Sequence, residues 1–236
     1  MNLKTFLEEG EEHYLPNISV DIVILGYQEG ILKVILQQLD DKWCLPGGYI
    51  RKEESVSDAA IRVLEERTGL KQSYLQLFQV FGSPNRSFSD QFKTILEKNG
   101  YTWHKDLWIN QRFITLAHYA LVDIDKVFPN GGLFSLDYGW FPLDNLPTMH
   151  MDHEAIVVDS KEQLKRDITV EHISFKLLPE TFTMPELQKL HEAILDKKLE
   201  RSRFQKKMLS MEVFERLPEP KENAPRRKPY VYRFKV

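Results

Sequence analysis

Cysteine and long apolar runs are both scarce in this sequence. Cys44 is the only cysteine in 236 residues, so the chain can form neither an intramolecular disulfide nor a metal site built from paired cysteines. The longest apolar stretches, such as 18–25 and 114–122, are strand-sized and shorter than the ~20 residues that a membrane-spanning helix needs. No basic segment followed by an apolar one opens the chain. These absences predict a soluble cytoplasmic protein without a membrane partner, in which Cys44 is a small core residue.

The charge is unevenly distributed along the chain. Residues 1–169 hold 17 Lys and Arg against 25 Asp and Glu, a net charge of −8, whereas residues 170–236 hold 15 against 10, a net charge of +5. A localised basic module is typical of nucleic-acid recognition, although a basic segment can also be solvated surface alone. The composition shifts at the same place, so we expect two domains, 1–168 and 169–236.

Strands and helices alternate through the first domain. Residues 18–25 and 31–38 are rich in β-branched side chains and are separated by a glycine-flanked turn, which predicts a hairpin. Apolar residues recur at helical spacing within 53–70, which predicts a helix that ends near Gly69. The other expected elements are a helix or loose arm at 1–14, strands at 75–81, 113–122 and 140–143, and helices at 89–98 and 152–165.

A motif of fixed spacing occupies residues 48–70. Seven residues match the pattern G-x5-E-x7-R-E-U-x-E-E-x-G-U, in which U is aliphatic: Gly48, Glu54, Arg62, Leu64, Glu66, Gly69 and Leu70. This stretch resembles the Nudix box, and the expected strands on either side of it agree with that family's fold. The resemblance implies an α+β chain that begins with an α/β/α sandwich around a mixed sheet.

The departures from this motif bear on activity. In active Nudix hydrolases, carboxylates at the positions of Val63, Glu66 and Arg67 jointly hold Mg²⁺ against a diphosphate. Two of these three carboxylates are absent here. A cation in place of an anion turns attraction to the metal into repulsion, and the Coulomb energy of one pair of unit charges is roughly 4 kcal/mol at 4 Å and an effective dielectric constant of 20. Glu54 and Glu66 remain, and Glu54 is expected to pair with Arg62. We therefore expect a ligand-sensing pocket without a metal, a cofactor or efficient hydrolysis.

The second domain shows the pattern of a winged helix. Thr183 and Glu186 form a capping box and Pro185 lies in the first turn, which together predict the start of a helix. A basic second helix at 200–210 follows after a short turn, and strands are expected at 212–217 and 230–235. Helix, turn, basic helix and a two-stranded wing are the order of a winged helix-turn-helix domain.

The basic residues of this domain are candidate DNA ligands. Arg203, Gln205 and Lys206 are the expected base-edge contacts, because Arg and Gln pair bidentately with guanine and adenine. The other candidates, mainly for phosphates, are Arg201, Ser202, Lys207, Arg226, Arg227 and Lys228. An ordinary amphipathic helix with a solvated basic face is the alternative for 200–210.

Together the two halves resemble the Nudix-related transcriptional regulators of the NrtR and AraR types. The resemblance implies a homodimeric repressor that binds a double-stranded DNA operator and releases it on binding an effector. The effector is ADP-ribose for the NrtR type and L-arabinose for the AraR type. Residues 62–70 favour the sugar-responsive AraR type, so we expect a repressor of pentose utilisation whose effector is L-arabinose, another pentose or ADP-ribose. Residues 89–108 depart from both types and are interpreted as an insertion that covers the ligand or forms a surface subdomain.

Five polar residues are candidates for the effector pocket, because a polyol needs bidentate donors and acceptors. They are Asp21, Arg86, His118, Asp152 and His153. His118 is equally typical of a core histidine, and Asp152-His153 of a helix cap. Two rival functions remain open: a Nudix phosphohydrolase acting on ADP-ribose or another nucleoside diphosphate derivative, and a protein–protein adaptor.

Overall fold

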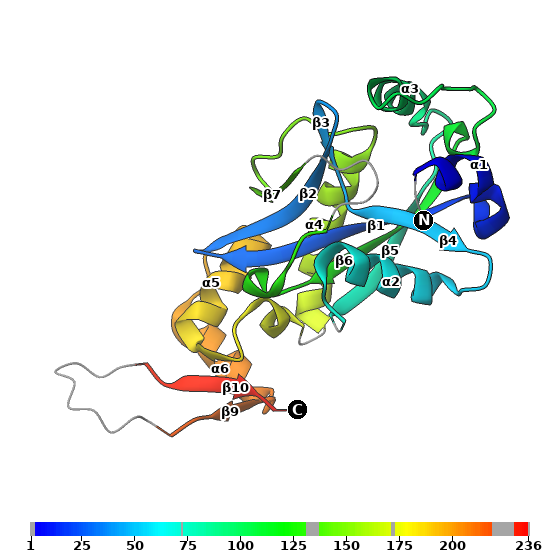
Figure 1. Ribbon diagram of the computed structural model, residues 1–236. Helices are drawn as coiled ribbons and strands as arrows, with labels where there is room; N and C mark the ends of the chain where they lie inside the picture. Colours follow the sequence, from blue (N-terminus) through cyan, green and yellow to red (C-terminus); the bar gives the residue numbers. More distant parts are fainter. Residues whose placement is uncertain (1–2, 72, 131–136, 171–172, 219–228, 236) are drawn as a thin grey trace.

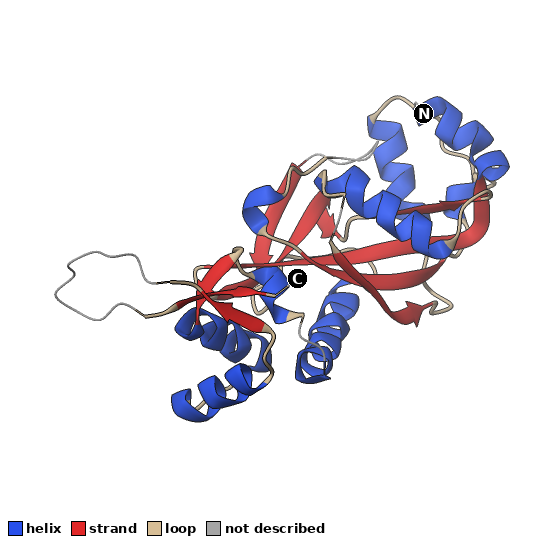
Figure 2. Ribbon diagram, turned by 90° about the horizontal axis from the view of Figure 1, so that it is seen from below, coloured by secondary structure: helices blue, strands red, loops and turns tan. Residues whose placement is uncertain are grey.

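The computed structural model describes residues 3–71, 73–130, 137–170, 173–218 and 229–235. A seven-stranded sheet with helices on both faces forms the N-terminal domain, and a three-stranded sheet with two helices forms the C-terminal domain. The expected α+β class is therefore confirmed, as a sandwich followed by a winged helix-turn-helix domain (Figures 1 and 2). Within the described residues, none of the helices combines the length and the apolar composition that crossing a membrane requires.

The large sheet is mixed, as expected. Its strands are β1 (Tyr14–Gln28), β2 (Ile31–Leu39), β3 (Lys42–Cys44), β4 (Gly47–Arg51), β5 (Tyr74–Phe81), β6 (Ile114–Leu121) and β7 (Asp137–Pro142). Their order is β3-β2-β1-β6-β5, with β4 paired to β1 and β7 paired to β2. β1 and β6 run parallel and the other pairs are antiparallel. The predicted hairpin is β1–β2, and its turn places Glu29 and Gly30 at φ 54° and 84°, as a two-residue hairpin loop demands.

The helices of this domain are α1 (Leu3–His13), α2 (Val56–Thr68), α3 (Ser89–Lys98) and α4 (His153–Val170), with 3₁₀ turns η1 (Trp108–Asn110) and η2 (Ile124–Lys126). Helices cover the two faces of the sheet, and two of them, α1 and α3, pack together at one end of the molecule (Figure 1). α2 ends at its C-cap Gly69, as the sequence predicts, and the structure shows Ser55 as its N-cap. Its apolar side packs with Ile22 and Ile24 on one face, while Ile156 and Leu164 of α4 pack on the other. α4 continues to Val170, so the boundary expected at residue 168 falls within its last turn.

The C-terminal domain follows the predicted order. It comprises η3 (Ser174–Leu177), β8 (Thr181–Thr183), α5 (Met184–Leu195), α6 (Arg201–Ser210), β9 (Phe214–Arg216) and β10 (Val231–Phe234), with the strands in the order β8-β10-β9. The capping box of Thr183 and Glu186 is present. β8 was not expected from the sequence. Three candidate wing residues, Arg226, Arg227 and Lys228, lie outside the described residues.

One apolar core runs through both domains. Val34 of the large sheet, Leu164 of α4, and Leu187 and Phe204 of the helix pair belong to a single buried cluster. α5 packs against β2 and α4. The winged helix is thus anchored on the α4 side of the sheet, at the end of the molecule away from α1 and α3 (Figure 1).

Candidate ligand pocket and nucleic-acid interface

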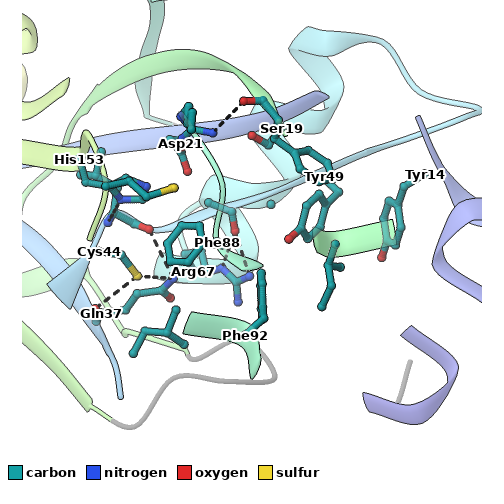
Figure 3. Close-up of a pocket in the computed structure, with 18 of the residues that line it drawn as sticks. Tyr14, Ser19, Asp21, Gln37, Cys44, Tyr49, Arg67, Phe88, Phe92 and His153 are labelled. Carbon is teal, nitrogen blue, oxygen red and sulfur yellow. Dashed lines mark hydrogen bonds and ion pairs between the residues drawn. The ribbon is translucent and has the colours of Figure 1, made fainter. Parts of the chain in front are cut away.

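A cavity of about 470 Å³ opens where β1, β4 and α2 meet the segment before and within α3. This volume lies in the ~300–1,000 Å³ range of small-molecule sites. In Figure 3, Tyr14 and Tyr49 lie on one side of the cavity and His153 on the other, with Arg67 and Phe88 between them. The cavity therefore has an aromatic end and a polar end.

Arg86 organises the polar end. Its side chain is buried, and its Nη2 donates to Asp21 Oδ2 at 2.6 Å. Its Nε donates to Asp152 Oδ1 at 3.1 Å, and its Nη1 to the Phe113 carbonyl oxygen at 3.3 Å. The structure thus brings together Asp21, Arg86 and Asp152, three of the five residues expected at the pocket. Two carboxylates face the one guanidinium, so the buried positive charge of Arg86 is compensated.

His153 joins the same group from the start of α4. It is 2% exposed, and its Nδ1 accepts a hydrogen bond from the Leu45 backbone N–H at 2.9 Å. Burial lowers its pKa, so the ring is neutral near pH 7 and the proton lies on Nε2. That buried Nε2 has no hydrogen-bond partner among the described residues, and the ring lines the cavity. A ligand oxygen is the acceptor that this donor lacks.

His118 is the pocket residue that the sequence misplaced. It lies beside Ile22 in the parallel pairing of β1 and β6, on the α2 face, whereas Asp21 points to the opposite face. Successive residues of a strand alternate between faces, so His118 cannot reach the polar end. It is buried, bonds through Nδ1 to the Leu116 carbonyl oxygen at 2.9 Å, and has a pKa lowered by burial. The alternative of a core histidine is therefore the right one.

The surviving glutamates of α2 and its preceding loop are bound to arginine. Arg62 donates from Nη2 to Glu54 at 2.6 Å and from Nη1 to Glu66 at 3.1 Å. Its Nη2 also reaches the Tyr49 carbonyl oxygen at 2.9 Å, and Arg51 lies 3.6 Å from Glu66. The bonds from Arg62 lower the pKa of Glu54. The expected Glu54–Arg62 pair is present. Arg62 also links α2 to β4 through its bond to the Tyr49 carbonyl oxygen.

Arg67 lies where a metal ligand stands in active Nudix enzymes. Its Nε and Nη2 donate to the Gly47 carbonyl oxygen at 3.3 and 3.0 Å, and Val63 is 1% exposed in the apolar core. Among the described residues, no group of three or more His, Cys, Asp or Glu is placed to hold a metal ion. Oxygen-rich donor sets are what Mg²⁺ requires, so these residues do not fit a divalent cation.

The aromatic end depends on α1 and the segment after β5. Trp108 donates from Nε1 to the Phe6 carbonyl oxygen at 2.9 Å and stacks on Tyr14 with ring centroids 5.6 Å apart. Tyr49 meets the edge of Trp108 at 4.7 Å. From residues 89–108, Phe92 reaches the cavity wall, whereas Trp103 and His104 do not line it. Residues 89–108 therefore help to cover the cavity, and sequence reasoning missed the contribution of Tyr14, Tyr49 and Phe92.

The outer face of α6 is the candidate nucleic-acid interface. Phe204 and Met208 face the core, and Glu200 caps the helix by accepting from the backbone N–H of Ser202 and Arg203 at 2.8 and 2.6 Å. The other predicted residues lie on the outer side: Arg201, Ser202, Arg203, Lys206 and Lys207 are exposed and Gln205 is half-buried. In the described part of the chain, these cations form no ion pair with a carboxylate. They are free to meet phosphates.

The turn before α6 is held rigidly by Glu192. Its carboxylate accepts from the Leu199 backbone N–H at 2.9 Å, from Gln188 Nε2 at 3.0 Å and from Lys198 Nζ at 3.2 Å. The bonds from Leu199, Gln188 and Lys198 lower the pKa of Glu192 to about 2. This network fixes the angle between α5 and α6, and with it the presentation of the basic face.

Family comparison decides what kind of domain encloses the cavity. The NUDIX domain family model matches residues 15–160. The chain belongs to the Nudix family. A second family model, the NrtR DNA-binding winged helix domain, matches residues 174–234, which contain α5, α6 and the wing strands of this Nudix protein.

Individual relatives match either most of this chain or about three fifths of it. The ADPR responsive transcriptional repressor NtrR of Acinetobacter baylyi is 25% identical over 228 residues, which cover 93% of this chain and 82% of the relative. The ADP-ribose pyrophosphatase of Methanocaldococcus jannaschii is 26% identical over 146 residues, 61% of this chain and 72% of the enzyme. The crystal structure of Shewanella oneidensis NrtR complexed with a 27mer DNA matches with a TM-score of 0.68 and 23% identity, covering 92% of this chain and 93% of that one. At this identity the likeness establishes the shared fold.

Proposed function

We propose that this Nudix protein is an ADP-ribose-responsive transcriptional repressor that binds operator DNA as a homodimer. The observation that carries the proposal is the unpaired basic face of α6, on a domain matched by a DNA-binding winged-helix family. That face is joined in one chain to a Nudix pocket in which two of the three metal-binding carboxylates are replaced, by Val63 and Arg67. A pocket without the means of hydrolysis, linked to a DNA-binding module, is suited to sensing.

ADP-ribose replaces the pentose expected from the sequence. The Acinetobacter relative, which spans most of this chain, is named for its response to ADPR, so the expected AraR branch, L-arabinose effector and pentose operon lack support. The pocket favours the same choice. Tyr14 and Tyr49 offer aromatic surface for a base, and Arg67 offers a cation for a diphosphate. A free pentose has neither group.

A route from pocket to DNA runs along α4. The N-terminal end of this helix carries Asp152 and His153 at the polar end of the cavity. Further along, Lys161 and Lys165 each lie 2.8 Å from the carboxylate of Asp196, in the turn between α5 and α6. A ligand that moves the start of α4 thereby changes the placement of two winged helices across the dimer, and with it the half-site spacing that they match.

The direct test is binding to DNA from upstream of the protein's own gene, followed by fluorescence anisotropy. Wild-type protein is expected to bind one such duplex at least ~10³-fold more tightly than unrelated DNA. Arg203→Ala should weaken that binding by about 1–3 kcal/mol, whereas Lys4→Ala, on α1 at the far end of the molecule, should leave it unchanged. No binding to any upstream duplex at low salt, with an intact fold, would remove the proposal.

The rival phosphohydrolase gives a different result. It requires turnover of ADP-ribose in the presence of Mg²⁺, whereas the arginine at position 67 and the valine at position 63 leave no carboxylate set for the metal. We expect ADP-ribose to be recovered intact after prolonged incubation with Mg²⁺, as measured by liquid chromatography. Release of AMP at a rate proportional to protein concentration would favour the enzyme.

A further inference from the structure

We propose that Arg67 replaces the divalent cation of the Nudix site and binds the diphosphate of the effector directly, so that effector binding needs no metal. This inference rests on the proposed function, because it takes the effector to be a diphosphate. It goes further in naming the residue and chemistry that recognise the ligand. Four observations carry it: where Arg67 lies, which of its donors are free, which charges surround it, and what stands on either side.

The first observation is the position of the guanidinium. Arg67 reaches from the last turn of α2 to the Gly47 carbonyl oxygen, with its Nε at 3.3 Å and its Nη2 at 3.0 Å. A backbone carbonyl oxygen is a natural ligand of a hard cation, and here its lone pairs are engaged by N–H donors instead. The guanidinium and a metal ion therefore cannot share this place.

The second observation concerns the remaining donors. A guanidinium carries five N–H groups in a planar fork. The two bonds to Gly47 use Nε and one N–H of Nη2, and they hold the plane in a fixed orientation. The edge formed by Nη1 and the other N–H of Nη2 is left over, and Arg67 lines the cavity. Such an edge is the shape that binds a phosphate bidentately.

The third observation is electrostatic. Four arginines line the cavity, and three of them face carboxylates: Arg86 has Asp21 and Asp152, Arg62 has Glu54 and Glu66, and Arg51 has Glu66. Arg67 alone forms no ion pair within the described residues. The positive charge that a diphosphate needs is thus concentrated on this one side chain. The same pairs occupy Glu54 and Glu66, so these two carboxylates are not available to a metal.

The fourth observation is the arrangement along β4. Gly47, which Arg67 bonds, lies opposite Asp21 at the polar end, and Tyr49 at the aromatic end follows two residues later. Figure 3 shows Arg67 between these two ends. A ligand with a base at one end, a sugar at the other and a diphosphate in the middle places its charge at Arg67. The arrangement selects nucleoside diphosphate sugars over free sugars.

Isothermal titration calorimetry of the full chain tests this inference. ADP-ribose should bind with the same Kd, within about twofold, in EDTA and in Mg²⁺. Arg67→Gln should weaken binding in EDTA at least ~10-fold, because a charge-assisted bond to phosphate is lost. Lys71→Gln removes an exposed cation just beyond α2 and should leave the Kd unchanged. Thermal unfolding of each variant verifies that the fold is intact.

Three further outcomes decide between the possibilities. ADP-ribose binding that appears only with Mg²⁺, or that Arg67→Gln leaves intact, overturns the inference. If ADP-ribose fails to bind in either buffer, the proposed effector is wrong, and inorganic pyrophosphate becomes the deciding ligand. Pyrophosphate that binds in EDTA to the wild type but not to Arg67→Gln upholds Arg67 as a diphosphate receptor, and pyrophosphate that binds neither overturns it. Electron paramagnetic resonance with Mn²⁺ should show only the free-ion signal.

Discussion

Arg86 is 5% exposed and connects three separate parts of the chain through Asp21 on β1, Asp152 before α4 and the Phe113 carbonyl. A buried ion pair of this kind gains little over an apolar replacement, but the removal of one member leaves the other charges uncompensated. Arg86 therefore stabilises the fold and shapes the pocket at once.

Arg86→Ala should lower the free energy of unfolding by about 3–5 kcal/mol, because Asp21 and Asp152 then lose their buried partner. Lys126→Ala serves as the control: it breaks an exposed pair with Asp123 and should cost less than about 1 kcal/mol. Urea unfolding followed by circular dichroism measures both. Equal losses of unfolding free energy in the two variants would show that the buried network stabilises the fold no more than an exposed ion pair does.

The sequence predicted part of this site. Asp21, Arg86, Asp152 and His153 do converge: Asp21 lies on β1, Arg86 follows β5, and Asp152 and His153 stand at the start of α4. His118 was predicted to line the pocket but lies on the other face of the sheet. Neighbouring residues of a strand point to opposite faces, and the sequence does not say which face the pocket is on. Arg67 was recognised only as a missing carboxylate. Its role as a donor emerges from the bond to Gly47, which no pattern of spacing reveals.

At the scale of elements, α1 is held against the cavity wall by the close approach of Gly10 to the indole of Trp108. A Cβ at Gly10 would lie 2.3 Å from Trp108 Cε2, so the indole packs on the helix only because this residue has no side chain. Trp108 in turn touches Tyr14 and Tyr49 of the cavity wall. The aromatic end of the cavity is thus assembled on a glycine of α1.

Gly10→Ala should destabilise the protein by about 1–3 kcal/mol, because overpacking against Trp108 outweighs the roughly 1 kcal/mol gain in helix propensity. Glu9→Ala, at an exposed position of the same helix, should change stability by less than about 0.5 kcal/mol. Thermal unfolding with intrinsic tryptophan fluorescence reports both effects. A stabilised Gly10→Ala protein would contradict the proposed packing.

His191 on α5 gives the winged helix a dependence on pH. Burial lowers its pKa to about 4 from the usual 6.5, with a smaller contribution from Lys207, and its Nε2 lies 2.9 Å from Ser174 Oγ. A lowered histidine pKa means that the unfolded chain takes up the proton first, so stability is lost as pH falls from 6.5 towards 4. The maximum loss from this group is about 3 kcal/mol.

Urea unfolding at pH 7, 6, 5 and 4 measures this dependence, with His191→Gln as the comparison. The variant keeps a donor for Ser174 but cannot titrate, so its stability should fall less steeply below pH 6.5 than that of the wild type. Parallel curves for the two proteins would mean that the carboxylates, and not His191, set the acid sensitivity.

Element prediction succeeded where caps and periodicity agree. α2 was located by its apolar periodicity and Gly69, and α5 by the capping box of Thr183, which are local signals. β8 has only three residues and exists because it pairs with β10 far along the chain. Pairing of this kind depends on tertiary structure, so no local sequence pattern predicts it.

At the scale of the whole molecule, α4 joins the cavity to the winged-helix domain. Its Lys161 and Lys165 hold Asp196, which adopts a left-handed conformation at φ 52° in the turn between α5 and α6. The apolar core shared by the two domains makes this a packed connection. Ligand and DNA are therefore expected to influence each other through α4.

Asp196→Asn should preserve the turn, because asparagine tolerates the left-handed region, while it removes the charge that Lys161 and Lys165 hold. Affinity for ADP-ribose alone and for DNA alone should be nearly unchanged, whereas the effect of one ligand on the other should shrink. Asp106→Asn, at an exposed position between α3 and η1, is the matched control. If the coupling is undiminished in Asp196→Asn, the ion pairs of Asp196 do not transmit it, and the apolar contacts of α5 are the next candidates.

The central claim is that ligand in the Nudix pocket controls DNA binding by the winged helix. The most direct measurement is fluorescence anisotropy of the protein on its upstream duplex, titrated with ADP-ribose and separately with L-arabinose. We expect saturating ADP-ribose to raise the Kd for DNA at least ~10-fold, a coupling of about 1.4 kcal/mol, and L-arabinose to have no effect. An unchanged Kd for DNA while calorimetry shows ADP-ribose bound would contradict this claim.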